Sequence, residues 1–440
     1  MEAHPPLDPD LLLRLNEFLV PALRVISCTR TRRHAAVYAR GLVGPAARKN
    51  VEQIARQARG VARTPAFERD LREMLTDPDW RHTAMMWESA ERFVGATTGW
   101  EGYTLDDTAL LKQGSHSVGV GNQYAGCVGG LSNCQVLVTI GIAQDHVSSP
   151  LAHELFLPEA WDSDPKRRAA CHVPETARHR PKWEMALDLL EQLDTWGMPR
   201  LPVLTDSGYG DVVAFRRRLE ACGREYVVGV DAQTAVWPAG LTFRRLPSPS
   251  LGRPTVRLAP APLCKPTSLK AFAAALPSDA WQTVIWRHGS RGLQRGRFAA
   301  VRVRPSNGWN VDRITPDDLL PECWVLLHWP EDEPEPTKMW MSNLSADTPM
   351  ATLVALARLR WRIERDYREG KGLAGLDHYE GRTWQGLHHH AALVVLTQQF
   401  LATERLKAVR ESLRDSAARD PPAPLVPSTE TPPLNAAFPP

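Results

Sequence analysis

The sequence predicts a mixed α/β protein with a helical N-terminal part and a β-rich insertion. Apolar residues recur at helical spacing up to about residue 98, and the period then changes to that of strands. From residue 183 to residue 230, helical and strand-like segments alternate, which is typical of a sheet covered by helices. Between residues 231 and 345 the chain is rich in Pro and Trp and again has the pattern of strands.

Residues 1–98 are expected to form a helical DNA-binding domain. Gly and Pro divide this segment into short helices whose apolar positions include Leu11, Leu12, Leu15, Phe18, Leu19, Ile54, Phe67, Leu71 and Leu75. Between residues 21 and 63, ten Lys and Arg stand against one acidic residue, although the whole chain carries only +3. Such a local excess favours contacts between Arg30, Arg32 and Arg33 and DNA phosphates, with an Arg-rich solvated face as the alternative.

Residues 99–230 and 346–405 are expected to form one α/β domain, interrupted by residues 231–345. Its strands are predicted at Tyr103–Asp106, Ser117–Tyr124, Cys134–Ala143, Leu201–Thr205 and Tyr226–Val230, and its helices at Trp183–Trp196, Val212–Ala221 and residues 349–369. Strands of the insertion are predicted at Thr283–Arg287, Arg297–Val303, Trp324–Trp329 and Lys338–Met341. Residues 406–440 form a C-terminal segment whose last twenty residues, with eight Pro, are expected to be a disordered tail.

Two carboxylates each follow a predicted strand, and a third lies within the last predicted helix. They are Asp107, Asp206 and Glu364. Because Mg²⁺ prefers oxygen ligands, carboxylates from separate elements predict a metal site for phosphodiester chemistry. Asp106 and Asp107 would point to opposite faces of a strand, so only one of them can easily reach such a site. Taken alone, an Asp at either strand end also fits a turn or a helix cap.

The sequence around Glu364 resembles the Tyr-Arg-Glu-Lys signature of DDE-type insertion-sequence transposases. Arg360, Glu364 and Lys371 have the spacing of its Arg, Glu and Lys, whereas Ala357 stands where the signature has Tyr. Further likeness to one subgroup lies in residues 372–382, 116–120, 133–136 and 155–161. The resemblance covers roughly residues 30–405.

This resemblance implies an RNase H-like catalytic domain and transposase activity. Asp107, Asp206 and Glu364 would hold two Mg²⁺ ions, which Mn²⁺ can replace, for hydrolysis and strand transfer of DNA phosphodiesters. Comparison with the family's Asp-Thr favours Asp107 over Asp106. Arg360 would clamp a phosphate with two hydrogen bonds, and Lys371 would act as a point charge. The implied partners are double-stranded DNA, at the element ends and the target, and a second copy of the chain in a homodimer on DNA.

Cysteine usage and hydropathy favour a cytoplasmic protein, associated with the nucleoid and not with a membrane. The seven Cys form no Cys-x-x-Cys pair, and an odd number cannot form a complete set of intrachain disulfides. The first residues lack the pattern of a signal peptide, and no run of about 18 apolar residues occurs.

Two further groups of residues have a structural as well as a functional interpretation. His388, His389 and His390 would point about 100° apart on a helix and so cannot easily bind one ion together, which favours a polar helix start or a DNA-facing patch. One Trp of the insertion could stack on an extruded base, although core packing is the commoner use of Trp. These residues are Trp237, Trp281, Trp286, Trp309, Trp324, Trp329 and Trp340.

Two other functions are compatible with the sequence. A catalytically inactive, transposase-derived DNA-binding protein would account for Ala357, but the three carboxylates argue against it. A plain metal-dependent nuclease would share the carboxylates and lack strand transfer, which an assay for strand transfer would reveal.

Overall fold

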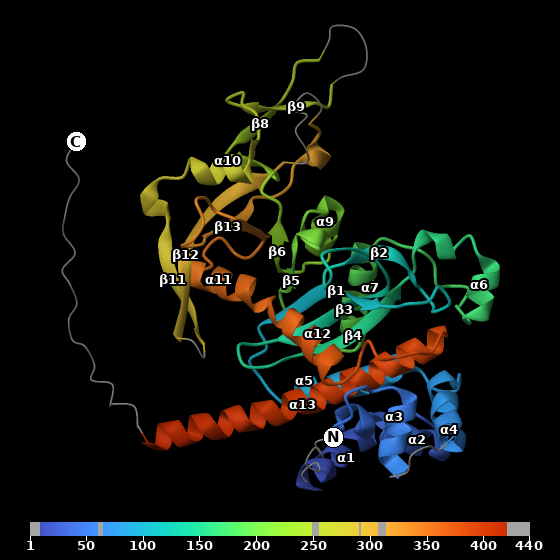
Figure 1. Ribbon diagram of the computed structural model, residues 1–440. Helices are drawn as coiled ribbons and strands as arrows, with labels where there is room; N and C mark the ends of the chain where they lie inside the picture. Colours follow the sequence, from blue (N-terminus) through green and yellow to red (C-terminus); the bar gives the residue numbers. More distant parts are fainter. Residues whose placement is uncertain (1–8, 60–64, 249–254, 290–291, 307–313, 420–440) are drawn as a thin grey trace.

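A continuous mixed sheet of twelve strands runs through the residues that the computed structural model describes, which are 9–59, 65–248, 255–289, 292–306 and 314–419. The long helix α13 (Trp384–Arg419) passes between this sheet and the N-terminal helices (Figure 1). Within the described ranges, no helix is both long enough and apolar enough to cross a membrane. The predicted disordered tail falls on residues 420–440, outside the described residues.

The described residues before the first strand are helical, as predicted. Apolar side chains at helical spacing, such as Leu15 and Leu19 of the first helix, are fully buried because they pack toward the other helices and α13. The helices are α1 (Pro9–Leu23), α2 (Thr29–Val43), α3 (Val51–Arg59), α4 (Pro65–Thr76) and α5 (His82–Gly95). Helices α1, α2, α4 and α5 contact α13, and α5 and α13 in turn contact β4, so the N-terminal helices join the sheet mainly through these two helices.

The centre of the sheet has the predicted RNase H-like arrangement. Three successive antiparallel strands are followed by two parallel strands separated by helices, in the spatial order β4–β3–β1–β5–β6. Strand β3 is rich in Val and Ile and is buried along most of its length, as expected of a central strand. These strands are β1 (Gly102–Leu111), β2 (Gly121–Ala125), β3 (Gly130–Ala143), β4 (Ser148–Phe156), β5 (Val203–Thr205) and β6 (Tyr226–Val230).

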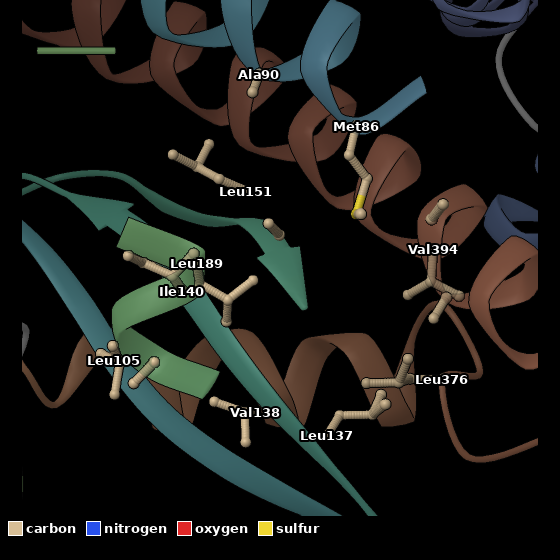
Figure 2. Packing of buried hydrophobic residues seen from close by; sticks show 14 of the residues in the cluster. Met86, Ala90, Leu105, Leu137, Val138, Ile140, Leu151, Leu189, Leu376 and Val394 are labelled. Carbon is tan, nitrogen blue, oxygen red and sulfur yellow. The ribbon is translucent and has the colours of Figure 1, made fainter. Parts of the chain in front are cut away.

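Helices cover this central sheet. Helix α7 packs on β3 and β4 through its buried apolar side chains, and α5 and α13 pack on β4. Figure 2 shows the resulting core, in which Met86 and Ala90 of α5 lie near Leu151 of β4 and Val394 of α13. The helices between β4 and β6 are η1 (Glu159–Trp161), α6 (Pro165–Ala170), α7 (Lys182–Thr195), α8 (Ser207–Gly210) and α9 (Val213–Ala221).

The insertion between β6 and the last helices extends the same sheet. Strand β14 pairs antiparallel with β6, and β13, β12 and β7 follow outward, so the two parts share one hydrogen-bonded ladder. Its elements are β7 (Ala235–Pro238), β8 (Thr242–Arg245), β9 (Leu258–Ala261), β10 (Thr267–Ser268), α10 (Leu269–Ala274), η2 (Ser278–Ala280), β11 (Gln282–Gly289), β12 (Gly292–Pro305), η4 (Pro316–Asp318), β13 (Cys323–Trp329) and β14 (Lys338–Ser342). The strands predicted in this region are therefore confirmed, with longer bounds.

Three predicted elements differ from the observed ones. Strand β1 does not end at Asp106 but continues to Leu111, because the apolar residues after the Asp pair remain in register with β3. The strand expected at Ser117 begins only at Gly121. The single helix expected over residues 349–369 is two helices, α11 (Met350–Leu359) and α12 (Arg362–Gly372), joined by a tight turn of i→i−3 hydrogen bonds.

The histidines at the start of α13 lie in the core. His388, His389 and His390 are each at most 1% exposed, so the expectation of a DNA-facing patch is wrong. His388 Nδ1 lies 2.9 Å from the Trp384 oxygen of the same helix, whereas His389 Nδ1 lies 2.7 Å from the Leu75 oxygen of α4 and His390 Nε2 lies 3.1 Å from the Gly375 oxygen. The rings of His389 and His390 therefore join α13 to neighbouring segments of the chain.

Candidate active site

The two neighbouring carboxylates of β1 point to different surroundings. Asp106 Oδ2 lies 2.9 Å from Arg360 Nη1, in the turn between α11 and α12. Asp107 Oδ2 lies 2.8 Å from Lys182 Nζ at the start of α7, and its other oxygen accepts a 3.4 Å hydrogen bond from the Tyr209 hydroxyl. This divergence follows from the alternation of side chains along a strand.

Asp206 lies at the carboxyl end of β5, as predicted. Its side chain accepts a 3.0 Å hydrogen bond from the Gly208 nitrogen and so caps the short helix α8. The backbone of this turn packs directly on β6, where a side chain on Gly229 would come within about 3 Å of the backbone of Asp206 and Ser207. Glycine at this position therefore lets the carboxylate sit at the edge of the sheet, where sites in α/β folds gather.

The register of β1 and β5 aligns Asp106 with Asp206. Tyr103 pairs with Val203 and Thr104 with Leu204 in parallel, so two residues further along each strand the two Asp stand level. Residues level on adjacent strands point to the same face. Burial, and then the negative charge of Asp206, raise the pKa of Asp106 above its usual range.

Glu364 joins this group through Arg360. Glu364 stands in the first turn of α12, and its Oε1 lies 2.6 Å from Arg360 Nη2. The same guanidinium contacts Asp106 through its other terminal nitrogen, so it bridges carboxylates from β1 and α12. Arg360 can face both because it stands in the two-residue turn, with Trp361, between the end of α11 at Leu359 and the start of α12 at Arg362.

The donor set suits hard divalent cations. Three carboxylates, Asp106, Asp206 and Glu364, face a single guanidinium that contacts two of them directly, so the cluster has an excess of negative charge. Oxygen donors of this kind bind Mg²⁺ or Mn²⁺. Among the described residues, no three His, Cys, Asp or Glu already stand close enough to hold an ion, because Arg360 lies between two of these carboxylates.

The sequence-based choice of the first carboxylate is not supported by this geometry. The sequence favours Asp107 as the metal ligand and predicts that the Asp106 side chain points away from the metal site. In the structure, Asp106 forms an ion pair with Arg360, and Asp107 forms one with Lys182. The parallel alignment with Asp206 is the signal that separates the two residues. It depends on a pairing between strands about a hundred residues apart, which a local pattern does not contain.

The predicted phosphate-binding residues fall in different places. Lys371 Nζ donates a 2.8 Å hydrogen bond to the Ala109 oxygen of β1, and burial lowers its pKa. On α2, Arg30 pairs with Asp70 at 2.6 Å, and Arg32 donates to the Ile26 oxygen at 2.9 Å. The Arg33 side chain is exposed and has no hydrogen bond or ion pair with any described residue. Of these cations, only Arg360 contacts the carboxylates.

A cleft of about 700 Å³ opens beside the carboxylates. Asp206, Arg360 and Glu364 line one part of it, and residues of the insertion line another. No local sequence pattern places the insertion residues Lys338 and Gln294 at the site, since their position depends on how β14 and the β11–β12 hairpin join the sheet. Ala357, where the resembled signature has Tyr, lines the same cleft and is 6% exposed.

Comparison with known proteins gives one match that decides the family. Residues 22–293 match a family model described as DDE superfamily endonuclease, a range that contains Asp106, Asp107 and Asp206 and ends before Arg360. No curated protein matches the sequence. A cryo-EM structure of a piggyBac transposase synaptic complex with hairpin DNA is similar to the chain, with 8% identity, a TM-score of 0.40, and coverage of 95% of this chain and 80% of that chain. A likeness of that level says nothing about function.

Proposed function

The chain belongs to the DDE superfamily endonucleases, and on this premise we propose that it is a transposase that binds the ends of a mobile DNA element, cuts them and joins them to target DNA. The observation that carries the proposal is the convergence of Asp106, Asp206 and Glu364 around Arg360. Carboxylates from two strands and a helix, gathered beside a cleft, are what metal-assisted phosphodiester chemistry requires.

The proposed metal ligands are Asp106, Asp206 and Glu364. Two Mg²⁺ ions, or Mn²⁺ in their place, would supply a nucleophilic water at neutral pH and neutralise charge on the scissile phosphate. Burial is the main cause of the raised pKa of Asp106, and the negative charge of Asp206, which a divalent cation would balance, raises it further. Asp107, which pairs with Lys182, is proposed to help hold β1 against α7.

Arg360 is proposed to serve as the internal counterion and as a phosphate contact. Its guanidinium holds Asp106 and Glu364 in place when no cation does, and its planar fork of donors suits two oxygens of a phosphate. Each role needs the fixed geometry of a guanidinium, so a lysine at this position should not replace it fully.

The proposed nucleic-acid partner is double-stranded DNA, bound at both element ends by two copies of the chain. Support for DNA binding comes from the basic character of residues 21–63 and from Arg33, which has no partner among the described residues. Two active sites would be needed to cut and join two ends, which is why we propose a homodimer on DNA.

The test is cleavage and joining of duplexes that carry the DNA flanking the coding sequence. The wild type should cut one strand at each end with Mg²⁺ or Mn²⁺, and the freed 3′-hydroxyl should join to a target plasmid. Asp206→Asn and Glu364→Gln should bind the same duplexes and leave them uncut, because each removes a ligand and retains the side-chain shape. Cleavage without joining would leave a plain nuclease, and binding without cleavage by the wild type would leave an inactive DNA-binding relative.

A further inference from the structure

The insertion supplies one wall of the cleft that leads to the carboxylates. Trp286 of β11, Gln294 of β12 and Lys338 of β14 line it together with Arg358 of α11. Trp286 is fixed across the hairpin, since its Nε1 donates a 3.1 Å hydrogen bond to Gln294 Oε1 and its ring meets Phe298 edge to face. The wall is therefore a defined surface rather than a set of free side chains.

Arg358 lies on this wall without a counterion. Its guanidinium carbon is 4.3 Å from the centre of the Trp286 ring, which is the geometry of a cation–π contact. No carboxylate of the described residues pairs with Arg358, and its Nε is buried without a hydrogen-bond partner. Its neighbour Arg360, in contrast, is committed to Asp106 and Glu364. Arg358 is thus held in place beside the cleft, and its positive charge has no carboxylate partner among the described residues.

Lys338 is the second unpaired cation on the wall. It is exposed, lines the cleft, and has no ion pair with any described residue. Arg358 and Lys338 both act on the same imidazole: after burial, their charges lower the pKa of His328, so His328 adds no charge of its own near neutral pH. The wall carries positive charge, while Asp206 and Glu364 line another part of the cleft.

We infer that Arg358, held against Trp286, and Lys338 bind backbone phosphates of the DNA strand whose neighbouring phosphate lies at the carboxylates. That the bound strand is DNA rests on the proposed function. A polyanion is the ligand that suits two unpaired cations spaced along one cleft, and a guanidinium stacked on an indole keeps its terminal nitrogens free to donate. Arg358 is then a positioning residue, which holds the strand while other groups act on it.

The experiment measures how salt weakens binding of a labelled single strand of about 30 bases, because the slope counts phosphates neutralised, about 0.7 for each on a single strand. Binding is followed by fluorescence anisotropy with the full chain in EDTA, so that cleavage plays no part. Arg358→Ala and Lys338→Ala should each flatten the slope by about 0.7, and the double variant by about twice that. Arg358→Lys should keep the wild-type slope, since it keeps the charge.

Arg297→Ala is the matched control. Arg297 stacks on Trp329 of the same insertion at 4.6 Å and does not line the cleft, so its loss removes a similar contact and the same charge. It should leave the slope unchanged, and the melting temperatures of both alanine variants should fall by a similar small amount. Equal slopes in Arg358→Ala and the wild type, equal flattening in Arg297→Ala, or no binding by the wild type would each overturn the inference.

The salt-dependence experiment and the cleavage assay can fail independently of each other. A flattened slope in Arg358→Ala together with no cleavage by the wild type would uphold the phosphate contact and reject the transposase. Cleavage by the wild type together with an unchanged slope in Arg358→Ala would support the proposed chemistry and reject the phosphate contact.

Discussion

Two clusters of titratable side chains, the partly buried carboxylates beside the cleft and the buried histidines of α13, differ in whether neighbouring groups balance their charge. Asp106, Asp206 and Glu364 share one guanidinium and keep an excess of negative charge. The histidines bond to backbone carbonyls and a hydroxyl, and burial lowers their pKa so that they stay neutral. Carboxylates whose charge is not fully balanced therefore lie at the candidate site, whereas neutral histidines with hydrogen-bond partners lie where the N-terminal helices pack.

The largest expected effect is a loss of stability in acid that comes from the histidine cluster. The cluster also includes His153 of β4, which lies close to His388 and His390. Burial lowers the pKa of these imidazoles, to about 3 for His153 and His390 and about 4 for His388 and His389, while an unfolded histidine titrates near 6.5. Below pH 6.5 the unfolded chain therefore takes up protons that the folded protein does not, and stability falls as the pH falls. Each imidazole should cost on the order of 1 to 2 kcal/mol between pH 6.5 and pH 5.

Carboxyl groups with raised pKa act in the opposite direction. Burial raises the pKa of Asp366 to about 7, so over the same range the folded protein takes up the proton first and gains stability as the pH falls. Asp106 acts in the same direction as Asp366. Urea unfolding at successive pH values should still show a net loss of roughly 2 to 4 kcal/mol from pH 6.5 to pH 5, since the four imidazoles outnumber the two carboxyls. Asp366→Asn should steepen that loss, and a flat profile in the wild type would contradict the comparison.

The second prediction separates the two carboxylates of β1. Asp106→Asn should slow metal-dependent cleavage by about 10³-fold, equivalent to about 4 kcal/mol, because it removes a proposed ligand. Its melting temperature should stay the same or rise, since a buried carboxylate with a raised pKa is replaced by a neutral side chain. Asp107→Asn should keep most of the activity. If the two variants behaved the other way round, the assignment made from sequence would stand.

Local patterns predicted which elements exist, but not how distant elements meet. The strands of the insertion were predictable because each alternates or is locally apolar, and α12 because its residues recur at helical spacing. The continuation of the sheet from β6 into β14 was not, because that pairing joins residues more than a hundred positions apart. The break after Leu359 was also missed, since Arg360 and Trp361 keep helical backbone angles and only the hydrogen bonding changes.

The candidate site was predictable to the same extent. Asp206 and Glu364 could be named because each stands at a recognisable place, the end of a buried strand and the first turn of a helix. The choice between Asp106 and Asp107 depended on the register between β1 and β5, and the role of Arg358 depended on the approach of the β11–β12 hairpin. Both are properties of the folded chain.

The third prediction concerns a histidine whose two nitrogens are both satisfied. His390 Nδ1 lies 3.0 Å from the Tyr38 hydroxyl, and Nε2 lies 3.1 Å from the Gly375 oxygen. His390→Leu should lower the free energy of unfolding by about 2 to 3 kcal/mol, because it leaves a buried hydroxyl and a carbonyl without this partner. Tyr38→Phe should cost about 1 kcal/mol, since one hydrogen bond is lost. Cleavage per folded molecule should not change, and a selective loss of activity would give the cluster a functional role.

The smallest effect is expected on α2, where two neighbouring arginines differ in whether the side chain has a hydrogen-bond partner. Arg32 donates to the Ile26 and Ser27 oxygens and so holds the chain between α1 and α2, whereas Arg33 is exposed without a partner among the described residues. Arg33→Ala should leave stability unchanged and flatten the salt dependence of duplex binding by about 0.9, one phosphate on B-DNA. Arg32→Ala should instead cost about 1 kcal/mol of stability and leave that slope unchanged. The two variants carry the same net charge, so a difference between their slopes reports position and not charge. Equal slopes would mean that the basic face of α2 is solvated, and that unpaired charge does not mark a binding surface outside the cleft.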